Sequence, residues 1–445
     1  MKKLFQKIAG LLPHNIIGAG LASMVIKFLG AIMSYGMIVA FARFMTVEEY
    51  GRFAFGINLA IIVSVIGGFG FTTAILRYWP KYIVARDFAG ARGVVRLGYL
   101  AVLCGSLIFL VPNIVIAIGS YYLYGTIHNA EFLAISCLAL VLGVGDYSTN
   151  LLRAQGSVVV SMLPRDVLWR LLSVVAAAAI IWLGYSISGP VAILLCAIVM
   201  VMLVAWQLIA IRNTVRKVSN TNESRNDWKL VTSSLLPIWA SSIIIAMIQQ
   251  FDVVIVGTFL SSADAGAYFA AQKTAALLSL VLIVASLVAA PTMSKLYHSD
   301  KHDELQRLCR NLAGVIVFVT AIGFLVLAIS GRFLLALFDP NFVSAYWILI
   351  IVAIGTMVDA IAGPNAYLMQ MTAFERPYLR IMVVCYSVVL IAQLILLPKF
   401  GALGAAAASA GGVVAWNVWA IVILRRDASL DPSLLALFSS PRPKK

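Results

Sequence analysis

Charged residues are scarce in this sequence. Only 11% of its 445 residues are Asp, Glu, Lys or Arg, whereas 62% are hydrophobic. Soluble globular domains carry about 25% charged residues. So little polar surface cannot cover a water-soluble body of this size, and the composition therefore excludes a soluble globular protein.

Cysteine is also rare. The five cysteines are scattered and form no CxxC pair, so we expect buried apolar side chains and neither a disulfide framework nor a metal site. His298 and His302 stand one helical turn apart, but no third ligand accompanies them. The sequence contains no P-loop, HExxH or DxD motif, and its outer loops are short. We therefore expect no metal, no cofactor and no enzymatic activity.

Long apolar runs, in contrast, recur along the whole chain. About 20 consecutive apolar residues are enough to span a bilayer as a helix. The first run is long and lacks a small-residue cleavage site, so we expect an uncleaved membrane anchor. The pattern predicts an all-α polytopic membrane protein with about twelve transmembrane helices, near 14–43, 47–79, 93–119, 130–153, 163–184, 187–211, 230–260, 263–292, 311–331, 342–371, 378–398 and 401–424.

The basic residues that give the net charge of +15 are distributed according to the expected topology of these spans. Basic residues gather in alternate loops and at both ends of the chain, whereas the loops between them, such as "TVEE" and "SSADA", are poor in Lys and Arg. This is the positive-inside pattern, and it predicts that both termini are cytoplasmic. We therefore expect the basic excess to face membrane lipid, not nucleic acid.

One short stretch occurs twice. "ARFMTVEEYGRFAFG" opens at Ala42, and "GTFLSSADAGAYFAA" opens at Gly257, 257 − 42 = 215 positions later. Each copy contains a hydroxyl residue followed three residues later by an acid, Thr46 and Glu49 in the first and Ser261 and Asp264 in the second, which predicts a reciprocal capping box at a helix start. Asp146 and Asp359 are 359 − 146 = 213 positions apart. The chain is therefore predicted to be an internal duplication.

The duplication predicts two parallel-repeat lobes of six helices each, because six spans return the chain to the side from which it started. Such repeats hold substrate at the lobe interface and transport it by rocking. The predicted domains are an N-terminal lobe, a polar cytoplasmic linker, a C-terminal lobe and a cytoplasmic tail, at 1–211, 212–229, 230–426 and 427–445.

The repeated stretch and the N-terminal run "IIGAGLASMVIKFLGAIMSYGMIVAFARFMTVEEYG" resemble the start of polysaccharide biosynthesis, or O-antigen, flippases of the MATE-like superfamily. The resemblance implies a MATE-like fold in the bacterial cytoplasmic (inner) membrane. It also implies transport of an undecaprenyl-pyrophosphate-linked oligosaccharide, an O-antigen or exopolysaccharide repeat unit, by alternating access. The expected partners are this lipid-linked substrate, a coupling ion (H⁺ or Na⁺) and a polysaccharide polymerase or export machinery.

Ionisable residues inside the spans are the candidate site, because they are costly there and usually face a cavity or a partner. Lys27 lies near the middle of the first span and shares a face with Ser23 and Ser34. The cavity interpretation competes with a lysine that snorkels to the interface. A pyrophosphate requires cations, and Arg77 and Lys273 are the other candidates for binding it.

The second lobe holds a further set of polar candidates. Gln249 and Asp252 share a face of the seventh span, and Lys273 lies at similar depth on the eighth. Asp252 and Lys273 either pair with each other or change partners during transport. Asn58 occupies the position in the first repeat that is equivalent to Lys273 in the second, since 273 − 58 = 215. We therefore expect the side chain of Asn58 to provide a polar group at this position of the first lobe.

The duplicated acids Asp146 and Asp359 have two interpretations. They either relay protons for coupling or hold helices together by pairing with a basic residue, Arg153 or Arg77 in the case of Asp146. Pro364, inside the tenth span, predicts a bend there because proline cannot donate a backbone hydrogen bond.

Two other functions fit parts of the pattern. A MATE-type ion-coupled multidrug exporter would share the spans and lobes, but a cavity for cationic drugs should be acidic, unlike one lined by Lys27. A lipid-linked sugar polymerase or transferase would need large outer loops that carry its chemistry, whereas the longest outer loop here, around "SYYLYGTIHNAE", is short.

Overall fold

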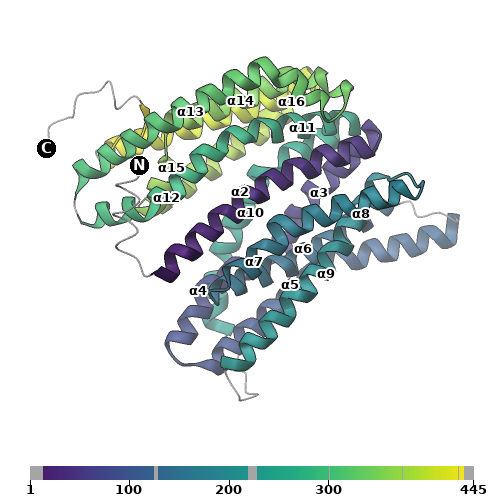
Figure 1. The fold of residues 1–445 in the computed structure, drawn as a ribbon, viewed down its shortest axis with the longest axis horizontal. Helices are drawn as coiled ribbons and strands as arrows, with labels where there is room; N and C mark the ends of the chain where they lie inside the picture. The colour runs from purple at the N-terminus through teal and green to yellow at the C-terminus, as the bar shows by residue number, and fades with distance from the viewer. Residues whose placement is uncertain are drawn as a thin grey trace. The chain divides into compact units, whose positions relative to one another are not determined.

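The computed structural model describes residues 14–124, 129–218, 228–299, 301–372, 374–428 and 430–434. Every regular element within these ranges is helical (Figure 1). The chain divides into two compact units, residues 1–254 and 255–445. The division falls inside one helix, α10 (Trp228–Phe259). The predicted lobe boundaries stay a prediction, and most of the predicted linker and tail lies outside the described residues.

The first unit is built around a central helix, α6, which packs against α3, α4, α5 and α9. Its interior is apolar, with Tyr147, Leu138 and Leu151 of α6 fully buried. The helices of this unit before α10 are α2 (His14–Phe44), α3 (Val47–Gly67), α4 (Phe71–Val84), α5 (Phe88–Tyr124), α6 (Ala130–Ala154), α7 (Val158–Leu163), the π-helical turn η1 (Pro164–Leu168), α8 (Trp169–Trp182) and α9 (Gly189–Val218).

In the second unit, α14 occupies the corresponding place and packs against α11, α13 and α16. The elements are α11 (Ser262–Ala275), the 3-10 turn η2 (Ala276–Leu278), α12 (Ser279–His298), α13 (His302–Ala336), the 3-10 segment η3 (Pro340–Ala345), α14 (Tyr346–Ala362), α15 (Asn365–Met371) and α16 (Glu375–Asp427). The bend expected at Pro364 is confirmed, because α14 ends and α15 begins around it.

Ten helical segments of the described chain are long and apolar enough to cross a membrane. Nine match one predicted span each. The tenth, α16, contains the last two predicted spans, which meet at Gly401, where φ is +61°. The predicted span 163–184 is instead split among α7, η1 and α8, because Pro164 lacks the N–H that a continuous α-helix requires there.

The predicted span 47–79 is also interrupted. Its helix ends at Gly67, and α4 begins at Phe71 after Phe69 and Gly70 take φ values of +45° and +76°. Glycine adopts such values without steric cost. The indole N–H of Trp239 on α10 donates to the carbonyl of Ile66 at 2.9 Å, in addition to the backbone N–H of Phe69 at 3.3 Å, and so ties α10 to the break.

The repeated turn carries the same helix cap in both copies. The hydroxyl of Thr46 accepts the N–H of Glu49 at 3.4 Å, and that of Ser261 accepts the N–H of Asp264 at 3.1 Å. In the second copy Asp264 also accepts the N–H of Ser261, which completes the capping box. In the first copy the reciprocal box was a wrong prediction, because Glu49 accepts the backbone N–H of Gly189 at 2.6 Å instead.

Candidate functional site

A π-helical turn in the first unit presents a cluster of charges. The turn η1 begins at Pro164 and carries Arg165 and Asp166, and α8 continues it with Arg170. A π-helical turn is wider than an α-helical one and often marks a functional site. Here it places consecutive charged side chains toward two different helices.

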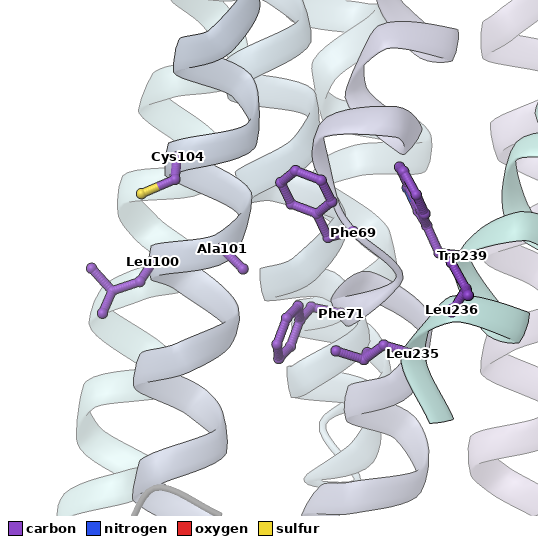
Figure 2. Close-up of a pocket in the computed structure, with 8 residues that line it drawn as sticks. All are labelled: Phe69, Phe71, Leu100, Ala101, Cys104, Leu235, Leu236 and Trp239. Carbon is purple, nitrogen blue, oxygen red and sulfur yellow. The ribbon is translucent and has the colours of Figure 1, made fainter. Parts of the chain in front are cut away.

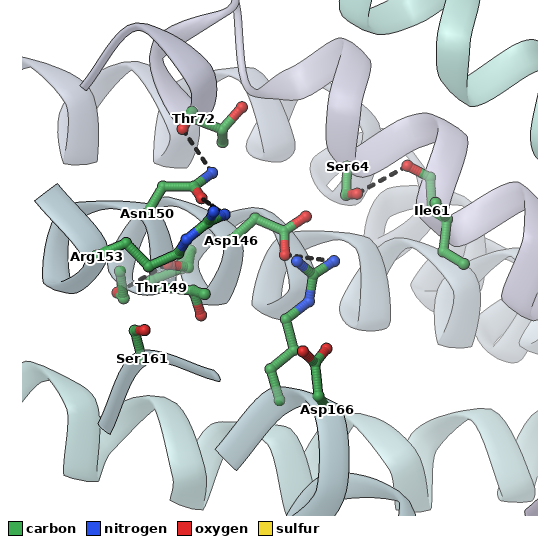
Figure 3. A network of polar contacts seen from close by, with 12 residues as sticks. Ile61, Ser64, Thr72, Asp146, Thr149, Asn150, Arg153, Ser161 and Asp166 are labelled. Atoms are coloured by element: carbon green, nitrogen blue, oxygen red, sulfur yellow. Dashed lines mark hydrogen bonds and ion pairs between the residues drawn. The ribbon is translucent and has the colours of Figure 1, made fainter. Parts of the chain in front are cut away.

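Two ion pairs join the turn to its neighbours. The ammonium of Lys27 on α2 lies 2.8 Å from a carboxylate oxygen of Asp166. The guanidinium of Arg165 lies 2.6 Å from a carboxylate oxygen of Asp146 on α6 (Figure 3). The guanidinium of Arg170 donates to the backbone carbonyls of Arg165 and Asp166. Three cations against two carboxylates leave a net charge of +1.

The side chains in these ion pairs differ in their solvent exposure. The side chain of Lys27 is 60% exposed, whereas those of Asp166 and Asp146 are 14% and 16% exposed. The acids are therefore shielded, and the cation of the outer pair is accessible. Of the four side chains in the two pairs, Lys27 is the most exposed, and Arg165 follows at 36%.

Glycine at position 30 makes the first pair possible. A Cβ added to Gly30 would lie 2.9 Å from the backbone oxygen of Asp166 and 3.1 Å from its Cβ. Helix α2 therefore approaches η1 to backbone contact. This approach lets the side chain of Lys27, one turn earlier, reach the carboxylate of Asp166.

A second polar chain extends from α6. The amide of Asn150 donates to the carbonyl of Thr72 at 2.7 Å and accepts from Arg153 at 3.4 Å (Figure 3). Arg153 therefore bonds Asn150. The predicted structural pairing of Asp146 through Arg153 or Arg77 was wrong in its partner, which is Arg165. Residues 164–168 form a wide π-helical turn, and this turn directs the side chain of Arg165 toward α6.

The other predicted substrate-binding residues lie at several places. Ser23 and Ser34 are partly buried on α2, and Arg77 is exposed on α4. Asn58 is buried on α3, where its amide donates to the carbonyl of Ala54 at 2.6 Å. The ammonium of Lys273 on α11, in the second unit, lies 5.2 Å from the ring centre of Phe269. Their role in binding stays a prediction.

The predicted coupling residues differ in their surroundings. On α10, Asp252 is partly buried and Gln249 is exposed. Asp359 on α14 accepts a hydrogen bond of 2.9 Å from the amide of Asn417 on α16. Asn417 in turn accepts from Asn365 at 2.7 Å. The duplicated acids are thus paired differently, Asp146 with a guanidinium and Asp359 with an amide.

The sequence patterns did not identify Arg165, Asp166 and Arg170 as site residues. A signal was present, because Arg165, Asp166 and Arg170 are three charges within the predicted span 163–184, and the first two directly follow Pro164. Charges at this density inside a predicted span indicate a functional segment.

An apolar pocket of about 460 Å³ lies elsewhere in the first unit (Figure 2). It is bounded by α5, by the break between α3 and α4, and by α10. Its lining contains no charged side chain, so it cannot neutralise an anion. The residues that line it are Phe69, Phe71, Leu100, Ala101, Cys104, Leu235, Leu236 and Trp239.

Solved structures define the class of this fold. An inward-facing multidrug resistance MATE family transporter of the MOP superfamily matches with a TM-score of 0.67 and 16% identity, over 92% of this chain and 98% of that one. The lipid II flippase MurJ, in an inward closed conformation, matches with a TM-score of 0.64 and 15% identity, over 95% and 91%. The chain therefore has the fold of the MATE and MurJ transporters, as predicted.

Sequence comparison identifies the family. The family model described as polysaccharide biosynthesis protein matches residues 19–297, and the chain belongs to this family. Two relatives come from Haloferax volcanii. The probable low-salt glycan biosynthesis flippase Agl15 is 25% identical over 406 residues, 89% of this chain and 78% of that protein. The probable flippase AglR is 27% identical over 195 residues, 42% of this chain and 40% of that protein.

Proposed function

We propose that this protein is a flippase that moves an undecaprenyl-pyrophosphate-linked oligosaccharide, an O-antigen or exopolysaccharide repeat unit, across the cytoplasmic membrane by alternating access. The observation that carries the proposal is the exposed ammonium of Lys27, held 2.8 Å from the shielded carboxylate of Asp166. The family, the transporter fold and the flippase relatives support it.

The charge cluster suits a pyrophosphate because its cations are already in place. Without substrate, Asp166 and Asp146 neutralise Lys27 and Arg165, which lowers the cost of holding charges in a membrane protein. A pyrophosphate brings several negative charges and strong acceptor oxygens. It replaces Asp166 as the partner of Lys27 and also gains the uncompensated positive charge of the cluster.

The cluster is also rigid enough to select a ligand. Arg170 holds the carbonyls of η1, and Gly30 keeps α2 in backbone contact with the turn. Cations that are positioned before binding lose less conformational entropy when the ligand arrives. Release follows when the lobes rock and Asp166 recovers Lys27.

The multidrug exporter is the second candidate, because MATE transporters have this fold. The net charge of +1 at the cluster argues against it, since an organic cation would be repelled there. A polymerase or transferase activity finds no supporting observation. The proposed setting is the bacterial inner membrane with both termini cytoplasmic, and the proposed partners include a polymerase or export machinery.

A reconstituted assay tests the function. Proteoliposomes are loaded with undecaprenyl-pyrophosphate-linked oligosaccharide on both leaflets, and an impermeant sugar-modifying enzyme is added outside. The flippase exposes all of the lipid-linked sugar, whereas vesicles without protein expose only the outer half. Uptake of a small organic cation in the same vesicles, with no sugar exposure, would establish the exporter instead.

A further inference from the structure

The chain turns back against the second unit after α16 ends. The backbone N–H of Leu430 donates to the carbonyl of Leu424 at 3.1 Å. A bond from beyond a helix end back into the last turn reverses the direction of the chain. Residues 430–434 therefore return to the helices, and we call them the return segment. Within it Leu430 and Ser433 are 2% and 0% exposed, and Pro432 is buried as well.

The backbone of the return segment is held by Gln306, near the start of α13. The amide nitrogen of Gln306 donates to the carbonyl of Asp431 at 2.6 Å, and its amide oxygen accepts the N–H of Asp431 at 2.8 Å. One side chain therefore satisfies both backbone groups of a single residue, and such groups need partners wherever water is excluded. This pair of bonds fixes the position of Asp431 relative to α13.

The side chain of Asp431 is fixed too. Nε of Arg425, near the end of α16, donates to Oδ2 of Asp431 at 2.9 Å, and a second guanidinium nitrogen lies 2.6 Å from the same oxygen. Oδ1 accepts the N–H and the hydroxyl of Ser433 at 3.0 and 2.6 Å. The side chain of Asp431 is 13% exposed. Both carboxylate oxygens are therefore engaged in a shielded ion pair, which is stronger than a pair on the open surface.

The return segment lies directly on the break between α14 and α15. Gly363 at this break has a φ of +73° and a ψ of −161°, a combination that is essentially restricted to glycine. A Cβ added to Gly363 would collide with the backbone carbonyl of Pro432 and would lie 3.3 Å from the Cβ of Ala313 on α13. The backbone of the break therefore contacts the backbone of the return segment, with no side chain between them.

Three contacts thus connect the return segment to the elements around this break. It is bonded to α13 through Gln306 and to α16 through Arg425, and it packs on Gly363. A few residues at the end of an element are enough to act as a hinge, because they absorb the change in φ and ψ. A change in the angle between α14 and α15 at Gly363 would displace the carbonyl of Pro432. The bonds of Asp431 resist this displacement.

We propose that the return segment is a restraint that keeps the break between α14 and α15 in one conformation, and that it must release Gln306 before the break changes its angle. The inference rests on the proposed function, because the restrained movement is a step of the transport cycle. Conformational steps of this kind often limit turnover. The restraint therefore slows transport, and its removal accelerates transport. Gln306 and Arg425 are positioning residues, since they act through the return segment.

Two shortened chains form a matched pair for the test. A stop after Asp427 removes the return segment, whereas a stop after Leu434 keeps it and removes only the residues that follow. Gln306→Ala is the full-length variant, and it deletes both bonds to the backbone of Asp431. This variant keeps the inference testable if the shorter chain does not fold. Size-exclusion profiles and thermal unfolding in detergent select the variants that fold.

A thiol at position 433 reports whether the return segment is in place. Ser433 is 0% exposed, so a maleimide reaches the thiol of Ser433→Cys only after the segment has moved. The reporter is made in a Cys104→Ser background, because Cys104 is exposed. Loss of two hydrogen bonds of ordinary strength should raise the labelling rate about tenfold in Gln306→Ala. With Gln306 intact, labelling should accelerate when lipid-linked oligosaccharide is added, because the segment opens in each cycle.

Transport is measured in proteoliposomes that contain the lipid-linked oligosaccharide, as the rate at which sugar of the inner leaflet becomes accessible to an impermeant sugar-modifying enzyme. We expect Gln306→Ala and the chain that stops after Asp427 to transport faster than the wild type. The gain should reach at most the factor of about ten by which labelling accelerates. The chain that stops after Leu434 should match the wild type.

Slower or unchanged transport in the folded variants that lack the restraint would overturn the inference and make the return segment a structural cap of α16. Labelling at position 433 that does not respond to the lipid-linked oligosaccharide would also overturn it. Equally fast transport by the chain that stops after Leu434 would place the restraint outside the return segment. Failure of the proposed function looks different, because the wild type and all variants would then expose no additional sugar.

Discussion

The ammonium of Lys27 and the carboxylate of Asp166 are 2.8 Å apart, although they come from the first long helix and from a π-helical turn more than a hundred residues later. The pair links an exposed cation to a shielded acid. This arrangement leaves the ammonium open to an incoming anion, which would displace Asp166 as its partner. It also leads to predictions that distinguish a role of Lys27 in substrate binding from a purely structural role.

Removing Lys27 tests its role in binding. Lys27→Ala leaves Asp166 without its cation, and we expect transport of the lipid-linked saccharide to fall by at least about tenfold, equivalent to about 1.4 kcal/mol. The double variant Lys27→Ala with Asp166→Ala removes both charges, so that no carboxylate is left without its cation. A binding role predicts that the double variant stays inactive, whereas recovered transport would reduce Lys27 to a structural partner. The proteoliposome assay measures both.

Removing only the acid should have the opposite effect on binding. Asp166→Asn keeps the shape of the side chain and frees Lys27 from its competitor. We expect inorganic pyrophosphate to bind to the purified protein about tenfold more tightly, since charged hydrogen bonds contribute about 1.5–3 kcal/mol. Isothermal titration calorimetry measures the change. Unchanged or weaker binding would mean that Asp166 does not compete with the ligand.

Gly30 offers a test of the helix contact. Gly30→Ala places a Cβ 2.9 Å from the backbone oxygen of Asp166, so α2 must move away from η1. We expect a loss of about 1–3 kcal/mol in stability, as for other overpacked sites. Gly36→Ala, on the same helix, has nothing within 4 Å of its new Cβ and serves as the control. Thermal unfolding in detergent compares the two, and equal midpoints would contradict the close contact.

Topology can be tested independently of transport. The positive-inside pattern predicts that a reporter fused at Asn220, in the segment between the predicted lobes, is cytoplasmic. An alkaline phosphatase fusion should be inactive there and a green fluorescent fusion should be bright. Fusions near Ser261, in the second repeated turn, should behave in the opposite way. The reverse pattern at both sites would invert the predicted orientation.

Much of the fold could be predicted from hydropathy and duplication. The apolar runs located nine spans singly and two more within α16, and the repeated turn located matching caps at Thr46 and Ser261. These features are local, because span length and helix capping depend on neighbouring residues. The break before α4 escaped prediction, because its apolar residues continue the hydropathy of α3 and only Gly67, Gly68 and Gly70 mark it.

The candidate site was predicted only in part. Lys27 was identified because a charge in a span is conspicuous, but its partner Asp166 was not. The same pattern that marked Asp146 as a candidate suggested Arg153 or Arg77 as its partner, whereas Arg165 holds that place. Which charged residues pair depends on the directions of the side chains on the turn. The hydrophobic periodicity of the sequence does not predict a π-helical turn, so it could not predict these directions.

The sequence by itself determined that this is a helical membrane protein with cations and acids inside its spans, because bilayer thickness and helix geometry leave few alternatives for such apolar runs. The tertiary structure alone decided which charges meet. It paired Lys27 with Asp166 and Asp146 with Arg165, and it gave Asp359 an amide in place of a guanidinium. Pairing depends on contacts between distant segments, which arise only when the helices pack.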